Sequence, residues 1–309
     1  MTTDNGVKGQ QFERTEEFDA FGPWVLPVRT RDEVPRLFRS FEQDPGSAQV
    51  VLKIPRRISR RDANPRMDLY DHLLVLRGDE LTLLSRAPGD TGGVRRRVVT
   101  GDQLLAVEDG AELLDGRFSV RVLDEKPLVV RYNGASRDTM APLVDGLRLL
   151  WRDTPPSKVG SGTVEHVPLG LRDLGPDVAL VGEYRELIAA EPAMDLRGAH
   201  ARLLVTPRDA GSMNRLVHKV WPMWLQGAVV CTDGVELMVL HRRSWWVRGS
   251  RPVHSIVRTV LPLTRTVPLE VVPTGYEDVE EIRVHHDAAR FPVPTGSPTQ
   301  RALLDLLES

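Results

Sequence analysis

The residues best suited to a chemical role form an arginine-rich run, KIPRRISRRDANPR, which begins at Lys53. Guanidinium groups match the oxygen atoms of phosphate and carboxylate in pairs, so this run predicts an anion-binding loop. The candidate ligands are Lys53, Arg56, Arg57, Arg60, Arg61 and Arg66. The alternative is a solvated face on which these cations pair with nearby acids such as Asp62, Asp68 and Asp71.

A second candidate combines tryptophan with arginine in the run HRRSWWVRGSR. This composition is typical of protein interfaces and of membrane-surface anchors, and tryptophan can also stack on a nucleobase. Neighbouring side chains on a strand point to opposite faces, so one of the paired tryptophans is expected in the core and the other at the surface. A further tryptophan ends a predicted helix. The interface candidates are Trp151, Trp245, Trp246, Arg242, Arg243 and Arg248.

Recognised catalytic and metal-binding patterns are missing from the sequence. It contains no phosphate-binding glycine loop, no nucleophile elbow and no zinc-protease helix motif. His285 and His286 are adjacent and would point to opposite faces of a strand, so they are not expected to share a metal ion. The single cysteine, Cys231, lies in an apolar run and is predicted to be a buried thiol. We therefore expect no catalytic residues and no cofactor, and an enzyme with an unrecognised site is the third hypothesis.

Composition restricts the class of protein. The 309 residues suffice for two domains of ordinary size, and a hydrophobic fraction of 41% is that of a globular chain. The net charge of −2 gives no general attraction to nucleic acid. The polar N-terminus does not resemble a signal peptide, and no apolar stretch approaches the roughly 20 residues of a membrane span. A cytoplasmic protein is expected, with peripheral membrane contact as the alternative.

Similar blocks recur in the two halves of the chain. The segment HLLVLRGDELTLLSR aligns with AVVCTDGVELMVLHR, which places Gly78 on Gly234. Three further pairs of blocks, two upstream and one downstream, occur in the same order in both halves. The separation between matched residues grows steadily along the chain, as loop insertions in a second copy would cause. This pattern predicts an internal duplication. The predicted boundaries are a disordered tail at 1–20, a first domain at 21–152, a linker at 153–170 and a second domain at 171–309.

Local patterns predict similar elements in each copy. The first copy is predicted to contain a helix at 31–44, strands at 50–54, 69–76, 80–86, 94–99, 104–107, 117–123 and 128–132, and a helix from about 136 to 151. The second is predicted to contain a helix at 178–190, strands at 201–205, 256–261, 267–272, 280–286 and 291–293, a hairpin at 228–242, and a closing helix from 297.

The stretches LTLLSR, GDQLLAVEDGAELLDGRFSV and YNGASRDTMAPLVDGL resemble the second half of a bacterial pleckstrin-homology-like domain. The resemblance implies an α+β, mostly β protein. It would consist of two tandem antiparallel β-barrels or sandwiches, each with a closing C-terminal helix. The N-terminal helix that we expect in each copy is a departure from the family pattern. The resemblance also implies a phosphate site in the arginine-rich loop.

We expect a non-enzymatic scaffold that docks a protein partner, through a sheet edge or the groove beside a closing helix. The alternative is binding of an anionic phospholipid or phosphorylated ligand by the arginine-rich loop.

Overall fold

The computed structural model describes residues 15–89, 93–152, 169–208, 218, 220–249, 253–263, 268–284 and 288–308. The chain forms two compact units, Met1–Val98 and Val99–Ser309. All the strand pairs with a defined register are antiparallel, and strands outnumber helices, which confirms the predicted α+β, mostly β class. The division between the units falls inside the first predicted domain. The predicted linker at 153–170 lies almost entirely outside the described residues.

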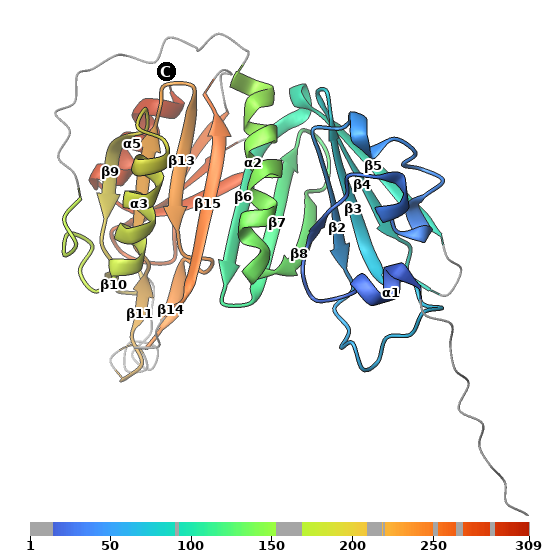
Figure 1. The fold of residues 1–309 in the computed structure, drawn as a ribbon. Helices are drawn as coiled ribbons and strands as arrows, with labels where there is room; N and C mark the ends of the chain where they lie inside the picture. The colour runs from blue at the N-terminus through green and yellow to red at the C-terminus, as the bar shows by residue number, and fades with distance from the viewer. Residues whose placement is uncertain are drawn as a thin grey trace, which may run out of the picture. The chain divides into compact units, whose positions relative to one another are not determined.

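The first unit contains one open, five-stranded sheet with its strands in chain order (Figure 1). Its elements are helix α1 (Glu16–Ala20) and strands β1 (Leu26–Pro27), β2 (Val50–Pro55), β3 (Tyr70–Arg77), β4 (Glu80–Arg86) and β5 (Val94–Thr100). The turn between β3 and β4 is centred on Gly78, whose φ of 61° is readily adopted only by glycine. The core of the unit includes Phe38, Leu73 and Val75, all buried.

The predicted helix at 31–44 is wrong. That stretch forms short 3-10 turns at Arg31–Glu33 (η1) and Arg36–Phe38 (η2), and a third follows at Pro45–Ser47 (η3). Pro35 is the reason, because it has no amide hydrogen and forces the preceding Val34 into an extended conformation, with φ −65° and ψ 126°. The apolar spacing still has an effect, since Val34 and Phe38 are both fully buried.

The prediction of a disordered tail at 1–20 is wrong for its last residues. Glu16–Ala20 form helix α1, whose first turn is capped by the Thr15 hydroxyl accepting from the Phe18 amide at 3.2 Å. Residues 1–14 lie outside the described residues.

The second unit is built on a seven-stranded sheet in the order β8-β7-β6-β15-β13-β12-β9. Its strands are β6 (Leu104–Glu112), β7 (Asp115–Val122), β8 (Leu128–Asn133), β9 (Asp195–His200), β12 (Ala228–Thr232), β13 (Glu236–His241) and β15 (Ser255–Pro262). A 3-10 turn, η4 (Gly101–Gln103), precedes β6. The pairing of β6 with β15, which places Asp109 opposite Arg258, joins strands of the two predicted copies in one sheet.

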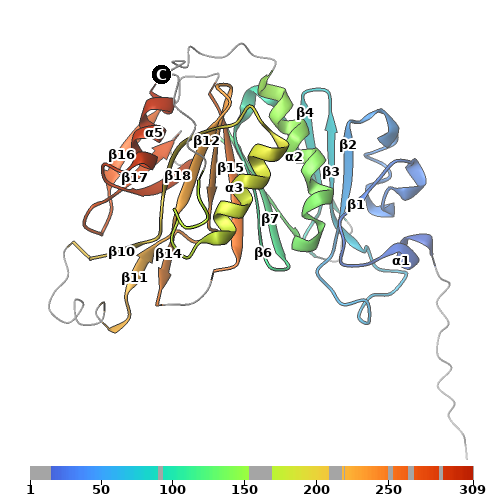
Figure 2. The same cartoon turned by 60° about the vertical axis from the view of Figure 1, so that its left-hand side comes forward.

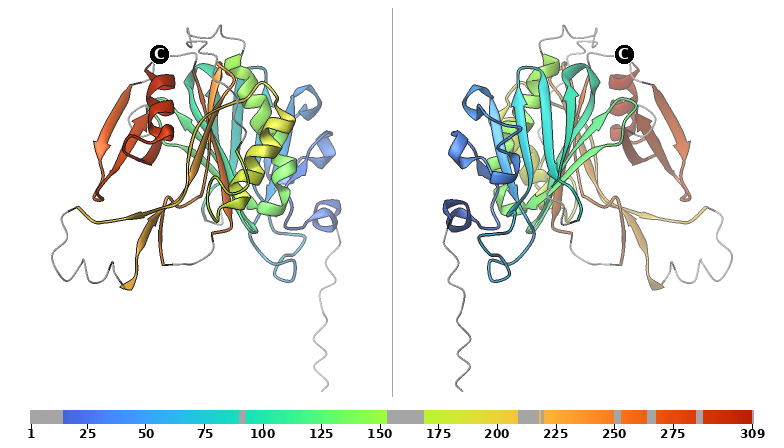
Figure 3. Two further views of the ribbon diagram at one scale, coloured as in Figure 1. Left: turned by 90° about the vertical axis from the view of Figure 1, so that its left-hand side faces the viewer. Right: turned by 90° about the vertical axis from the view of Figure 1, so that its right-hand side faces the viewer.

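Helices cover both faces of this sheet (Figure 3). On one face lie α2 (Arg137–Arg152), which follows the turn η5 (Gly134–Ser136), and α3 (Val178–Ala190). On the other lie α5 (Pro298–Leu307) and an antiparallel sheet of β16 (Leu269–Pro273), β17 (Val279–Val284) and β18 (Ala289–Pro294). The predicted helices at 136–151, at 178–190 and from 297 are confirmed. Ser297 caps the last of them by accepting from the Gln300 amide at 3.1 Å.

A third, smaller sheet extends from the second unit in the order β10-β11-β14 (Figure 2). Its strands are β10 (Leu203–Val205), β11 (Met223–Leu225) and β14 (Trp246–Arg248). The sequence patterns missed β1, β9, β11 and β14, and the other described strands overlap predicted ones. In the described part of the chain, no helix has both the length and the apolar character needed to cross a membrane.

Candidate anion-binding site

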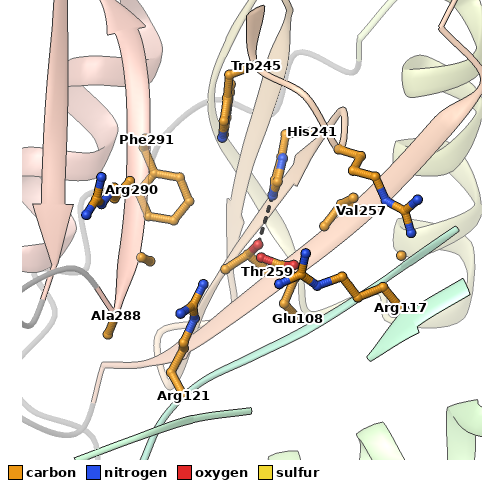
Figure 4. Close-up of a pocket in the computed structure, with 13 residues that line it drawn as sticks. Glu108, Arg117, Arg121, His241, Trp245, Val257, Thr259, Ala288, Arg290 and Phe291 are labelled. Atoms are coloured by element: carbon orange, nitrogen blue, oxygen red, sulfur yellow. Dashed lines mark hydrogen bonds between the residues drawn. The ribbon is translucent and has the colours of Figure 1, made fainter. Parts of the chain in front are cut away.

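A cavity of about 430 Å³ lies between the seven-stranded sheet and β18 (Figure 4). Its walls come from strands β6, β7, β13 and β15, from β18 with the residue before it, and from the segment after β13. The lining residues are Glu108, Gly110, Arg117, Arg121, His241, Arg243, Trp245, Val257, Thr259, Ala288, Ala289, Arg290 and Phe291. Four arginines and a single carboxylate therefore face this space, which gives it an excess of positive charge.

Two of the arginines, Arg117 and Arg121, come from β7. They are four residues apart on one strand, so they share a face of the sheet with Ser119 between them. Among the described residues, no side chain forms a hydrogen bond or ion pair with either guanidinium group. The Arg117 Nε and the Ser119 Oγ are buried donors without a partner. An unsatisfied buried donor costs roughly 1–3 kcal/mol, so this face of β7 is incomplete as it stands.

The other charged lining residues differ from this pair. Arg243 is held by an ion pair with Asp115 at 2.7 Å, and Glu112 lies 3.6 Å away. Arg290 is exposed on β18. Glu108 projects from β6, where it lies opposite Ser119 in the strand register. Arg117 and Arg121 are therefore the lining arginines whose guanidinium groups have no side-chain partner among the described residues.

A histidine and a tryptophan form another wall. His241 Nδ1 lies 2.8 Å from the Arg242 carbonyl, which can only accept, so Nδ1 carries the proton. Its Nε2 then accepts from the Thr259 hydroxyl at 2.8 Å. Burial lowers the pKa of the His241 imidazole, so the ring is neutral at pH 7. The Trp245 ring stacks on it, with 4.5 Å between centroids and 8° between planes.

The arginine-rich loop predicted as an anion site has several internal partners in the first unit. Lys53 is buried and donates to the Glu33 carbonyl at 2.8 Å, and burial lowers the pKa of its ammonium group. Arg56 donates to the Asp68 carbonyl at 3.1 Å. Arg60 donates to the Phe21 carbonyl and lies over the Phe18 ring. Those that reach solvent are Arg57, Arg60, Arg61 and Arg66.

The predicted interface residues lie at several places in the second unit. Trp151 is buried and donates to Glu236 at 2.9 Å. Arg242 is buried against Asp177, and the Trp246 ring stacks on Tyr276 at 4.6 Å. Arg248 is exposed. Of the six candidates, Arg243 and Trp245 are the two that line the cavity.

Arg117 and Arg121 were not among the predicted site residues. A signal for them was present, because DGRFSVRV alternates apolar residues with Arg117, Ser119 and Arg121, and this marks one polar face of a strand. Nothing local indicated that this face would meet β18.

In the part of the chain that the structure describes, no three His, Cys, Asp or Glu side chains gather as metal ligands. The predicted burial of Cys231 is confirmed, and burial raises the pKa of its thiol to about 12. Comparison with known proteins found no matching family model, no matching curated protein and no matching solved structure.

Proposed function

We propose that this protein is a binding protein that takes an anionic ligand in the cavity between β7 and β18. The observation that carries the proposal is the pair Arg117 and Arg121. Both guanidinium groups line an open cavity, and neither has a hydrogen-bond or ion-pair partner among the described residues. The other well-placed arginines of this unit, such as Arg148 and Arg242, are paired with carboxylates.

Electrostatics favour an anion at this position. Two like charges on one strand face repel each other, and partial burial weakens their solvation. A bound oxyanion relieves both effects and supplies an acceptor to the buried Arg117 Nε. Glu108 offsets part of the positive charge without forming an ion pair with either arginine. A ligand with more than one negative charge is therefore accommodated.

The neighbouring groups support binding more than catalysis. The pair His241 and Thr259 has the composition of a base and a nucleophile. Each nitrogen of His241 already has a hydrogen-bond partner, however, and Trp245 covers one face of the ring. This arrangement serves to position Trp245 at the cavity wall.

Calorimetric titration of the full chain with inorganic phosphate at low ionic strength tests the proposal. Charge-assisted hydrogen bonds of about 1.5–3 kcal/mol from two arginines give a Kd on the order of 1 mM. The double substitution Arg117→Gln and Arg121→Gln is expected to weaken binding at least about tenfold. If the affinity for phosphate is unchanged in the double variant, phosphate does not bind in this cavity.

Two controls complete this experiment. Arg301 is exposed on α5 and lies outside the cavity, so Arg301→Gln should leave the affinity for phosphate unchanged. A variant with Arg57→Gln and Arg61→Gln examines the alternative that the arginine-rich loop binds the anion. Loss of phosphate binding in this variant would transfer the site to the first unit.

The tandem pleckstrin-homology-like arrangement is also our proposal, and the order of elements supports it. From β2 onward the chain runs through four strands, three strands and helix α2. The second half contains β9, β12, β13 and β15 in one sheet, then β16, β17 and β18 in another, and then α5. The matched turn glycines, Gly78 and Gly234, both have positive φ, at 61° and 85°.

Docking of a protein partner is a second candidate function, and a separate surface favours it. Leu204 on β10 and the segment before β11 expose apolar side chains, with Val220 80% and Trp221 53% exposed. Exposed apolar groups that lie close together mark interaction sites on many proteins. The variant carrying Leu204→Ser and Trp221→Ser is expected to lose a partner that co-purifies with the wild-type chain, whereas Arg301→Gln keeps it. Retention of the partner by the serine variant would exclude this surface.

A further inference from the structure

We infer that the ligand of the cavity is an aromatic phosphate monoester, with its phosphate beside Arg117 and Arg121 and its ring against Trp245. The inference rests on the proposed function, because it specifies the ligand of the same site. It adds a chemical class, a doubly charged tetrahedral oxyanion joined to a small aromatic group.

The size of the cavity favours a ligand larger than an inorganic ion. Pockets for small organic ligands occupy roughly 300–1,000 Å³, and the volume of about 430 Å³ lies within that range. A lone phosphate ion placed between the arginines would leave most of this space filled with water. The organic part of a small ester fits the remainder.

The cavity is also chemically divided, as Figure 4 shows. Arg117 and Arg121 extend into it from β7, whereas Trp245 and Phe291 lie toward its other side. The Trp245 ring is fixed from two directions, by the stacked His241 ring and by the edge-on Phe291 ring at 6.3 Å. Trp245 remains partly exposed, so a face or edge of a fixed indole is available to a ligand ring.

Phosphate suits the arginine side better than carboxylate does. Each guanidinium group binds two oxygen atoms most strongly, and a carboxylate has only two oxygens, which one arginine occupies. A phosphate monoester has three terminal oxygens and about two negative charges, so it can engage Arg117 and Arg121 together. Glu108 lies nearby and is an acceptor for a hydroxyl group on the organic part.

Three probes separate the parts of this inference in calorimetric titrations of the full chain: inorganic phosphate, phenyl phosphate and benzoate. Phenyl phosphate is expected to bind about tenfold tighter than either of the others, because it alone reaches both sides of the cavity. Arg121→Gln should weaken phenyl phosphate binding about tenfold, and Arg301→Gln should not change it. Trp245→Leu should reduce the affinity for phenyl phosphate toward that of inorganic phosphate, with folding of the variant checked by its thermal unfolding.

The outcomes distinguish this inference from the proposed function. Equal affinity for phenyl phosphate and inorganic phosphate overturns the aromatic ester while leaving an anion site. Benzoate binding as tight as phenyl phosphate overturns the choice of phosphate. If none of the three anions binds, the proposed function itself falls.

Discussion

His200 is held as a neutral imidazole inside the second unit. Its Nε2–H donates to the Gln226 carbonyl at 3.1 Å, and its Nδ1 accepts from the Thr299 hydroxyl at 2.9 Å. Burial lowers its pKa to about 4, whereas an unfolded histidine titrates near 6.5. Between these values the unfolded chain binds a proton that the folded chain does not. The contribution of His200 to stability is therefore complete above about pH 6.5 and is lost as the pH falls toward 4.

The variant His200→Gln removes this linkage. Denaturant titrations between pH 6.5 and pH 4 should show that the free energy of unfolding falls by up to about 1.4 kcal/mol less per pH unit in the variant than in the wild type. Other buried histidines, such as His241, keep their own pH dependence in both proteins. Identical slopes in the two proteins would mean that His200 takes up its proton over the same pH range in the folded and the unfolded chain.

Glu236 is a second residue whose substitution is expected to change the stability of the protein strongly. It is fully buried on β13 and accepts from Trp151 at 2.9 Å, from Arg148 at 2.9 Å and from Arg152 at 2.7 Å. Glu236→Ala should lower the free energy of unfolding by about 3 kcal/mol, because removing one partner leaves a buried charge with less compensation. Glu308→Ala, at an exposed position, should change it by less than about 0.5 kcal/mol. If the free energy of unfolding falls by less than about 1 kcal/mol in the Glu236→Ala variant, these hydrogen bonds do not contribute as predicted.

At the scale of elements, the sequence predicted those helices and turns whose formation depends on neighbouring residues. Helix α3 at Val178–Ala190 and the Ser297 cap of α5 follow from spacing and capping chemistry, and the turn glycines from backbone freedom. The helix predicted at 31–44 fails because Pro35 outweighs a good apolar pattern. The missed strand β9 contains Gly198, a poor strand residue that tertiary packing requires.

Gly198 shows this requirement directly. A Cβ atom added there would lie 2.5 Å from the Pro298 carbonyl oxygen at the start of α5, so a side chain cannot fit without backbone movement. Gly198→Ala should destabilise the protein by about 1–3 kcal/mol. Gly182 in α3 has no neighbour within 4 Å of its added Cβ, and Gly182→Ala should instead stabilise by about 1 kcal/mol. Thermal unfolding of both variants measures the contrast, and equal effects of the two substitutions would refute the close approach.

The candidate site was less predictable than the fold for a related reason. The alternation around Arg117 and Arg121 marked a polar strand face, but the partners of that face come from β15 and β18, far along the sequence. The arginine-rich loop gave a stronger sequence signal, yet Lys53, Arg56 and Arg60 have partners within the first unit. The number of cations in a stretch of sequence therefore favoured the arginine-rich loop. The absence of partners among the described residues favours Arg117 and Arg121 in the cavity.

At the scale of the whole molecule, the seven-stranded sheet joins both halves of the sequence. Strand β6 pairs with β15 from Val107 opposite Val260 to Glu112 opposite Ser255. A chain cut in the predicted linker would separate these strands and expose an edge on each fragment. Fragment 1–152 contains the whole first unit, whereas the second unit is divided between the two fragments. Fragment 169–309, expressed separately, should therefore lack a cooperative thermal transition. A cooperative transition in fragment 169–309 would show that the second predicted domain folds as a separate body.

The most direct test of the central claim is to locate an anion in crystals of the full chain. Tungstate is a tetrahedral dianion that resembles phosphate, and its anomalous scattering identifies its position without reference to a ligand model. We predict a tungstate peak in the cavity, within hydrogen-bond reach of the guanidinium groups of Arg117 and Arg121. Tungstate peaks on other arginines, such as those of the 56–66 loop, with none in the cavity, would contradict it.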